Sequence, residues 1–321
     1  MAENEKNIKK TSIGGQALIE GIMMRGPKMT AMAVRNPEGE IVLEKWETEV
    51  SLKKGVRKIP FVRGIFNFID SMRFGYKCLM RSAEIAGLED EPKKTEQAEG
   101  EEANKKKGSS VGMTLLMIFS VVLGVVLAIG LFVALPTFLY SLLAKFVPFL
   151  SEDDRFLKSA FEGVLKVLIL IGYLAAVSLM KDIRRTFMYH GGEHKTIFCY
   201  ESGLPLTVEN VRAQRRFHPR CGTSFLILMI LVSILISMLI PVGIPTYLRV
   251  IIKLCLLPLI MGIGYELIKL AGKHDNLFTR IISAPGLWLQ RITVLEPDDD
   301  MIECAIAAMN EVIPNDESDN W

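Results

Sequence analysis

Long uncharged runs dominate the chain from residue 108 onward. Every residue from Gly108 to Ala144 is uncharged, a stretch longer than the roughly 20 residues that one membrane-spanning helix needs. Three more apolar stretches follow. The predicted transmembrane helices cover about 112–134, 161–180, 223–239 and 247–270. The pattern therefore predicts a membrane α-helical protein with about four transmembrane helices.

Charges interrupt two of these predicted helices. Glu162 and Lys166 stand four residues apart at the start of the second, where we expect them to pair and to reach the membrane interface. Lys253 and Glu266 interrupt the fourth, and the lysine is expected to extend to the interface in the same way. The first and third helices follow from uncharged length alone.

The first 88 residues have a different pattern, typical of a small soluble domain. Alternating apolar residues within 30–50, around a Pro and a Gly at 36–39, predict two strands and a turn. Residues 59–85 repeat apolar side chains at helical spacing, with basic residues between them. This helix is expected either to lie on an anionic membrane surface or to pack on the strands.

The sequence thus divides into four parts. Residues 1–88 form an α+β head, and residues 89–110, almost all charged or small, form a disordered tether. Residues 111–272 form the four-span membrane domain, with a loop at 181–222 between its second and third helices. Residues 273–321 form a C-terminal segment, in which an amphipathic helix with acidic residues at its start is expected to dock on the head.

The basic residues give an orientation in the membrane. Eight Lys and Arg side chains lie between Lys181 and Gly222, and Lys105 to Lys107 precede the first span. The other loops are acidic or uncharged, so the positive-inside rule places both termini and the 181–222 loop in the cytosol. The basic N-terminus has no apolar segment after it, so no signal peptide is predicted. We expect a multi-pass protein of the cytoplasmic membrane, in contact with the lipid bilayer.

Charge and cysteine content exclude other classes. The net charge of +2 and the lack of a basic stripe with interleaved aromatics argue against nucleic-acid binding. The five cysteines, an odd number at irregular spacing, do not form a disulfide pattern and are expected to be reduced thiols.

Three of the four histidines lie in the 181–222 loop, and they point to a metal. His190, His194, His218 and Cys221 supply three imidazoles and a thiolate, a sufficient ligand set for zinc, with Glu193 as a possible catalytic proton acceptor. Two consecutive glycines, at 191 and 192, disfavour a helix here, so the motif is expected in a loop or at a helix end. In the alternative, the histidines cap helix ends and the glycines shape turns.

Other polar residues are further candidates. Glu266 is either a functional group inside a span or half of an ion pair near the cytosolic end, and His274 and Asp275 follow it closely. Glu20 and Arg25 lie in a glycine-rich segment that either forms a turn or covers the cytosolic site as a lid.

Taken together, these motifs resemble a known family. The chain contains GGQALIEGIMMRGP, YHGGEHKTI, HPRCGTSF, GYELIKLAGKHDN, APGLWLQRIT and EPDDDMIECAI, and in these it is similar to the YqhQ-type bacterial membrane proteins, a domain of unknown function. The resemblance covers nearly the whole chain outside 89–110. It implies a cytoplasmic membrane protein and a predicted metal dependence that rests on the same His and Cys residues.

Two functions remain open from the sequence. In the first, the cytosolic His/Cys site binds zinc and supports hydrolysis of a bond near the membrane, with Glu193 as base. In the second, the protein is a non-catalytic scaffold or assembly factor in membrane-protein or envelope biogenesis, and its head and basic loop bind a cytosolic or membrane protein. The sequence does not decide whether the protein is an enzyme.

Overall fold

The computed structural model describes residues 10–48, 59–88, 115–116, 119–147, 149–150, 154–241, 243–273 and 276–320. Backbone contacts divide the chain into two compact units. We call the first, Met1–Asp90 with Ile171–Met229 and Met261–Trp321, the sheet unit, and the second, Glu91–Leu170 with Ile230–Ile260, the apolar unit. The tether predicted at 89–110 lies outside the described residues.

The sheet unit is built on a four-stranded antiparallel meander. Its strands are β1 (Gly14–Leu18), β2 (Gly21–Arg25), β3 (Met29–Arg35) and β4 (Ile41–Glu47), paired in chain order. The prediction of β3 and β4 is confirmed. The glycine-rich segment before them forms a strand pair rather than a turn or a loose lid. Its tight turn places Glu20 at a φ of 49°, in the left-handed region.

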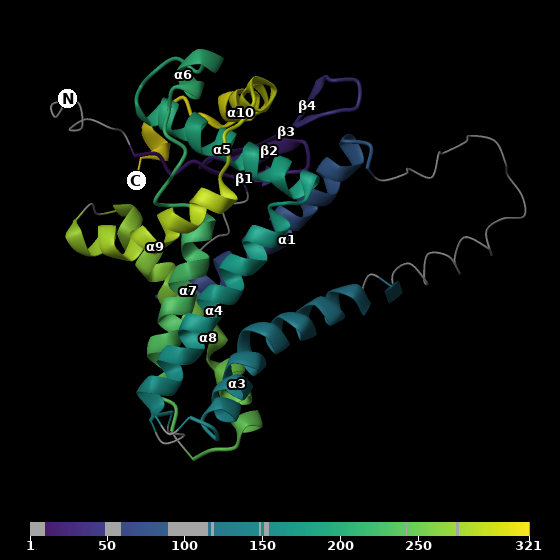
Figure 1. Cartoon of the computed structure of the whole chain (residues 1–321). Helices are drawn as coiled ribbons and strands as arrows, with labels where there is room; N and C mark the ends of the chain where they lie inside the picture. The colour runs from purple at the N-terminus through teal and green to yellow at the C-terminus, as the bar shows by residue number, and fades with distance from the viewer. Residues whose placement is uncertain are drawn as a thin grey trace, which may run out of the picture. The chain divides into compact units, whose positions relative to one another are not determined.

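Helices cover both faces of this sheet (Figure 1). Because side chains alternate along a strand, Ile22 and Met24 pack with α5 (Lys181–Glu201) and α10 (Asp299–Val312), while Met23 and Leu18 pack with α1 (Val62–Ile85). The sequence prediction of an amphipathic C-terminal helix that docks on the head is therefore confirmed as α10. Helix α1 contributes Cys78 to the core. It therefore packs on the strands, which is one of the two positions expected from the sequence.

Helix α5 runs without interruption through Gly191 and Gly192, so the prediction of a loop or helix end at this point is wrong. The two glycines serve tertiary packing. A Cβ added at Gly191 would come within 1.9 Å of the carbonyl oxygen of Leu295, whose backbone N–H donates to Phe187 on the same helix. Close approach of another segment requires glycine here, and packing outweighs the propensity cost of about 1 kcal/mol for a helical glycine.

Among the described residues, three helices are long and apolar enough to cross a membrane. They are Phe119–Leu143, α4 (Arg155–Val177) and Thr246–Ala271 within α8 (Thr246–Lys273). The first contains a π-helical turn, η3 (Gly130–Ala134), directly before α3 (Leu135–Leu143), which has Pro136 in its first turn.

The third predicted span is shorter than expected. Helix α7 (Gly222–Ser237) has 16 residues, or about 24 Å, against a hydrocarbon thickness of about 30 Å. It gives way to turns over residues 238–240, before Pro241. The remaining described elements are α6 (Val208–Arg212), α9 (Leu277–Thr293) and η4 (Glu317–Asp319).

Three charged residues of the predicted spans are buried within the apolar unit. Glu162 is 1% exposed and forms its ion pair with Lys253 of α8, not with Lys166 one turn away. Lys166 and Lys253 are themselves buried. The expectation that these side chains pair along one helix and reach out toward water is therefore corrected: they face the interior of the unit.

Candidate metal site

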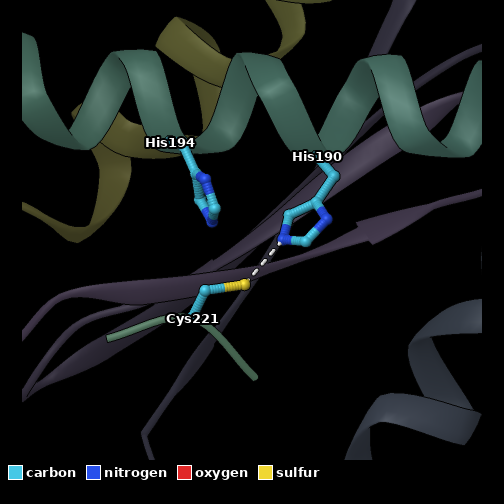
Figure 2. A group of neighbouring side chains, drawn as sticks. All are labelled: His190, His194 and Cys221. Carbon is cyan, nitrogen blue, oxygen red and sulfur yellow. Dashed lines mark hydrogen bonds between the residues drawn. The ribbon is translucent and has the colours of Figure 1, made fainter. Parts of the chain in front are cut away.

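Helix α5 and the residue before α7 bring three metal-ligating side chains together in the sheet unit. The donor atoms of His190, His194 and Cys221 all lie within 4.8 Å of one another. The two histidines are one helical turn apart, so their rings leave the same side of α5 and point toward the cysteine (Figure 2). This geometry depends on α5 being helical across Gly191 and Gly192.

Backbone carbonyls fix the orientation of both imidazoles. His190 Nδ1 lies 3.0 Å from the carbonyl oxygen of Thr293, and His194 Nδ1 lies 2.5 Å from that of Arg216. Because a carbonyl can only accept, each Nδ1 carries the proton and each Nε2 keeps a free lone pair. A ring N–H bonded to a carbonyl is the usual support of a metal-binding histidine.

The third donor, Cys221, is buried just before the first residue of α7. His190 Nε2 lies 3.1 Å from its Sγ (Figure 2). The Thr223 hydroxyl lies 3.2 Å from the same sulfur. The Thr223 backbone N–H also points at the sulfur, at 3.5 Å. Because His190 Nε2 carries no proton, the Cys221 thiol donates to it, and a bound metal ion would replace this proton.

The donor set fits zinc by its chemistry. Two neutral imidazoles and one thiolate are the borderline-soft ligands that zinc prefers, and catalytic zinc sites use three protein ligands. Ligands of one tetrahedral zinc lie about 4 Å apart at most, so this group is slightly wider than a closed site.

His218, the fourth ligand expected from the sequence, lies outside this group of three. Its Nδ1 accepts the backbone N–H of Arg220 at 3.2 Å, and its Nε2 lies 3.9 Å from a carboxylate oxygen of Glu201. Burial lowers the pKa of His218 to about 4, so the ring is neutral at neutral pH. It still packs beside His194, with ring centroids 5.6 Å apart.

Glu193 is buried between the two histidine positions and faces the sheet. Its Oε1 accepts the backbone N–H of Gly15, on β1, at 3.0 Å. Burial raises the pKa of this carboxyl, although the nearby His190 opposes the shift. The N-terminal glycine segment therefore does lie against the HxxEH motif, as a strand whose Gly15 leaves room for the glutamate side chain.

The other candidates lie in several different places. Glu20 accepts from Arg185 Nε at 2.6 Å and from the Tyr189 hydroxyl at 3.3 Å, which ties the β1–β2 turn to α5. Arg25 stacks over the Phe74 ring, 5.9 Å from its centroid.

Glu266 accepts from Arg63 Nε at 2.6 Å, so it is half of an ion pair whose partner comes from α1. No signal in the sequence indicated Arg63 as this partner. His274 and Asp275 lie outside the described residues.

The sequence did not predict the hydrogen bonds by which Gln290 holds the segment that carries Cys221. The Gln290 side chain on α9 accepts from the His218 backbone N–H at 2.8 Å and donates to the His218 carbonyl at 2.7 Å. It also donates to the Ser224 hydroxyl at 3.1 Å. A lone glutamine in an apolar helix was the available signal, but its partners come from a distant segment.

A buried ion pair holds the same segment from the other side. Arg220 bonds the Glu201 carboxylate and donates to the Thr11 carbonyl at 2.6 Å. The Thr11 N–H donates to Glu201 at 2.9 Å, and the Thr11 hydroxyl bonds Asp319 at 2.8 Å. Thr11, Asp319 and the end of α5 thus meet next to the segment that carries Cys221.

Fold and site together define a mostly helical protein with apolar helices of membrane-spanning length and a buried His/Cys group in its sheet unit. The chain belongs to the family described as Protein of unknown function (DUF1385), whose model matches residues 59–315. It is 38% identical over 302 residues to the uncharacterized protein YqhQ of Bacillus subtilis (strain 168), which covers 94% of this chain and 92% of that protein. No solved structure matches. The family resemblance expected from the motifs is confirmed.

Proposed function

We propose that this chain is a multi-pass protein of the cytoplasmic membrane that binds one zinc ion through His190, His194 and Cys221 on its cytosolic side. The observation that carries the proposal is the pair of carbonyl contacts that leave both Nε2 lone pairs free beside a thiol. A purely structural pair of histidines has no need of this matched arrangement.

The topology part of the proposal has four spans and cytosolic termini. Three described helices have the length and composition for a span, and α7 is short by a few residues. A short span is tolerated by local bilayer thinning at modest cost. The basic residues between Lys181 and Gly222 support a cytosolic position for the donor group.

The proposed activity is hydrolysis of an ester, amide or phosphoester bond near the membrane surface. Zinc with three protein ligands keeps a position for water and lowers the pKa of that water to about 7. Glu193, next to His194 on the same helix, is the proposed proton acceptor, and the Gly15 N–H holds its carboxylate in place.

Metal analysis tests the proposal. Full-length protein purified in mild detergent without chelator is expected to contain about one zinc per chain. His190→Ala and His194→Ala are expected to lose it, and a cooperative unfolding transition in zinc-free buffer shows that each variant is still folded. A folded wild-type preparation that takes up no zinc would overturn the proposal.

His218→Gln separates an open site from a closed one. Because His218 faces Glu201 and Arg220, the variant should keep its zinc. If it loses zinc as completely as His194→Ala does, the metal has four protein ligands. The hydrolytic role would then be excluded, although metal binding would stand.

An assembly role without catalysis is the second candidate. Helix α1 exposes four large apolar side chains: Phe68, Ile69, Met72 and Tyr76. This surface favours contact with an apolar surface of another protein. A scaffold would co-purify with one dominant protein, and the amount recovered would be the same for wild type and for His194→Ala.

A further inference from the structure

The apolar unit buries an unusual number of positive charges. Four cationic side chains lie within it, each at most 8% exposed: Lys158, Lys166, Arg249 and Lys253. The first two come from α4 and the others from α8. Buried lysines and arginines are rare in any protein unless they are paired.

One carboxylate stands among them. Glu162, 1% exposed, forms an ion pair with Lys253, whose ammonium also donates to the Thr137 hydroxyl at 2.7 Å. Lys158 donates to the Ser141 hydroxyl at 3.3 Å. Glu162 thus compensates one positive charge, that of Lys253.

Arg249 is the least satisfied member of the cluster. It is 2% exposed, and its NH1 makes one long bond, 3.4 Å, to the Pro241 carbonyl. Within the described part of the chain, its Nε and NH2 atoms have no hydrogen-bond partner. Nε lies 3.8 Å from Glu162 Oε1, beyond hydrogen-bond length, and that oxygen also lacks a partner among the described residues.

The balance of charge calls for an anion. Among the described residues of the cluster, Lys166, Arg249 and Lys253 stand with the single carboxylate of Glu162, which leaves an excess of two positive charges. The nearby Asp154 is exposed and already accepts the backbone N–H groups of Phe156 and Leu157 at the start of α4. Charges removed from water need a counter-charge close by, because the low dielectric makes both the burial cost and the attraction large.

We propose that this cluster binds a phosphate-class anion, either the phosphodiester of a lipid headgroup or free phosphate. The Nε and NH2 edge of a guanidinium is the edge that binds two oxygens of one phosphate, and in Arg249 this edge has no hydrogen-bond partner. The ammonium group of Lys166 supplies a point charge that suits a remaining oxygen.

The depth of the cluster is consistent with a headgroup. Lys158 and Arg249 are the fourth residues of their helices, and Glu162 and Lys253 are the eighth. They lie within about 12 Å of the helix starts at a rise of 1.5 Å per residue. In a spanning orientation, Arg249 then lies near the boundary between headgroups and hydrocarbon, and Glu162 and Lys253 lie about one helical turn deeper.

The test compares two cationic positions on one end of the unit. Arg249→Gln removes the unsatisfied guanidinium, whereas Arg155→Gln removes an exposed one at the start of α4. Full-length protein in a neutral detergent is used in two arms. In the first, thermal unfolding is followed against inorganic phosphate, with chloride at equal ionic strength. In the second, native mass spectrometry measures retained phosphatidylglycerol against phosphatidylcholine.

We expect saturable binding in one of the two arms. Binding of inorganic phosphate indicates a free phosphate, and retention of phosphatidylglycerol indicates a lipid headgroup. Binding should weaken about tenfold or more in Arg249→Gln, the equivalent of one lost charge-assisted contact, and stay unchanged in Arg155→Gln. If Arg249→Gln does not fold, Lys166→Gln carries the same expectation. Equal retention of both lipids together with no phosphate effect would overturn the proposal, as would equal losses in the Arg249 and Arg155 variants.

Discussion

The two units bury polar groups in opposite ways. In the sheet unit, the donor group consists of His190, His194 and Cys221, with both Nδ1 atoms bonded to carbonyls and the lone pairs turned inward. In the apolar unit, several buried groups are full charges of mostly one sign, and two nitrogen atoms of Arg249 have no hydrogen-bond partner among the described residues. Neutral donors held in place suit a cation, whereas uncompensated cations suit an anion. The sign and satisfaction of buried groups therefore indicate what each unit binds.

A crossed pair of variants gives the largest expected effect. His194→Ala should weaken zinc binding by roughly a hundredfold or more, since the loss of a direct ligand exceeds the 10–100-fold effect of its supporting contacts. Arg249→Gln should leave zinc binding unchanged. The measurement is competition for zinc against a chelator of known affinity. If both variants lose zinc equally, the two units do not bind independently and the comparison fails.

The second prediction uses the adjacent glycines of α5. Gly191→Ala places a Cβ 1.9 Å from the Leu295 carbonyl oxygen and should destabilise the protein by about 3 kcal/mol or more. Gly192→Ala meets nothing nearer than 3.5 Å and should be neutral or stabilising by up to about 1 kcal/mol. Thermal unfolding in detergent compares the two.

If Gly191→Ala destabilises the protein and Gly192→Ala does not, α5 must be helical and packed against the 294–297 segment. In a loop, as the sequence suggested, both substitutions would have small and similar effects. That outcome would remove the helical basis for placing His190 and His194 on one side.

The third prediction tests how the Cys221 segment is held. Gln290→Leu leaves the buried N–H and carbonyl of His218 without partners, at a cost of about 1–3 kcal/mol. Because Cys221 follows three residues later, zinc affinity should fall by about tenfold, as for other supporting contacts. Gln214→Leu, which removes only a local bond to Asn210, is the control. Unchanged zinc affinity in Gln290→Leu would show that the Gln290 hydrogen bonds do not position the cysteine.

The smallest effect is expected at Glu266. Its ion pair with Arg63 is partly exposed, so Glu266→Gln should cost about 1 kcal/mol and leave zinc content unchanged. Arg63→Gln should cost the same, and the double variant no more than either single one. Full additivity of the two losses would contradict the pairing.

The sequence predicted the site's composition better than its geometry. Residue spacing grouped His190, His194 and Cys221 but added His218, which lies outside the group of three. The helix through Gly191 and Gly192 could not be predicted, since the close contact with Leu295 that requires glycine joins residues about 100 positions apart.

Other errors have the same physical origin. Glu162 was paired with the neighbour on its own helix, because pairs at i,i+4 are the only ones that a single sequence displays. Its partner, Lys253, lies on another helix. Strands β1 and β2 escaped notice because glycine weakens the alternating pattern by which strands are recognised.

Zinc X-ray absorption on the purified protein measures the ligands of the proposed site. We expect one sulfur ligand at about 2.3 Å and two imidazole nitrogens at about 2.0–2.1 Å, with a light atom completing the shell. Cys221→Ser should remove the sulfur signal, and Cys255→Ser, which changes an exposed cysteine, should keep it. A zinc shell without sulfur in the wild-type protein, or one that keeps its sulfur in Cys221→Ser, would contradict the account.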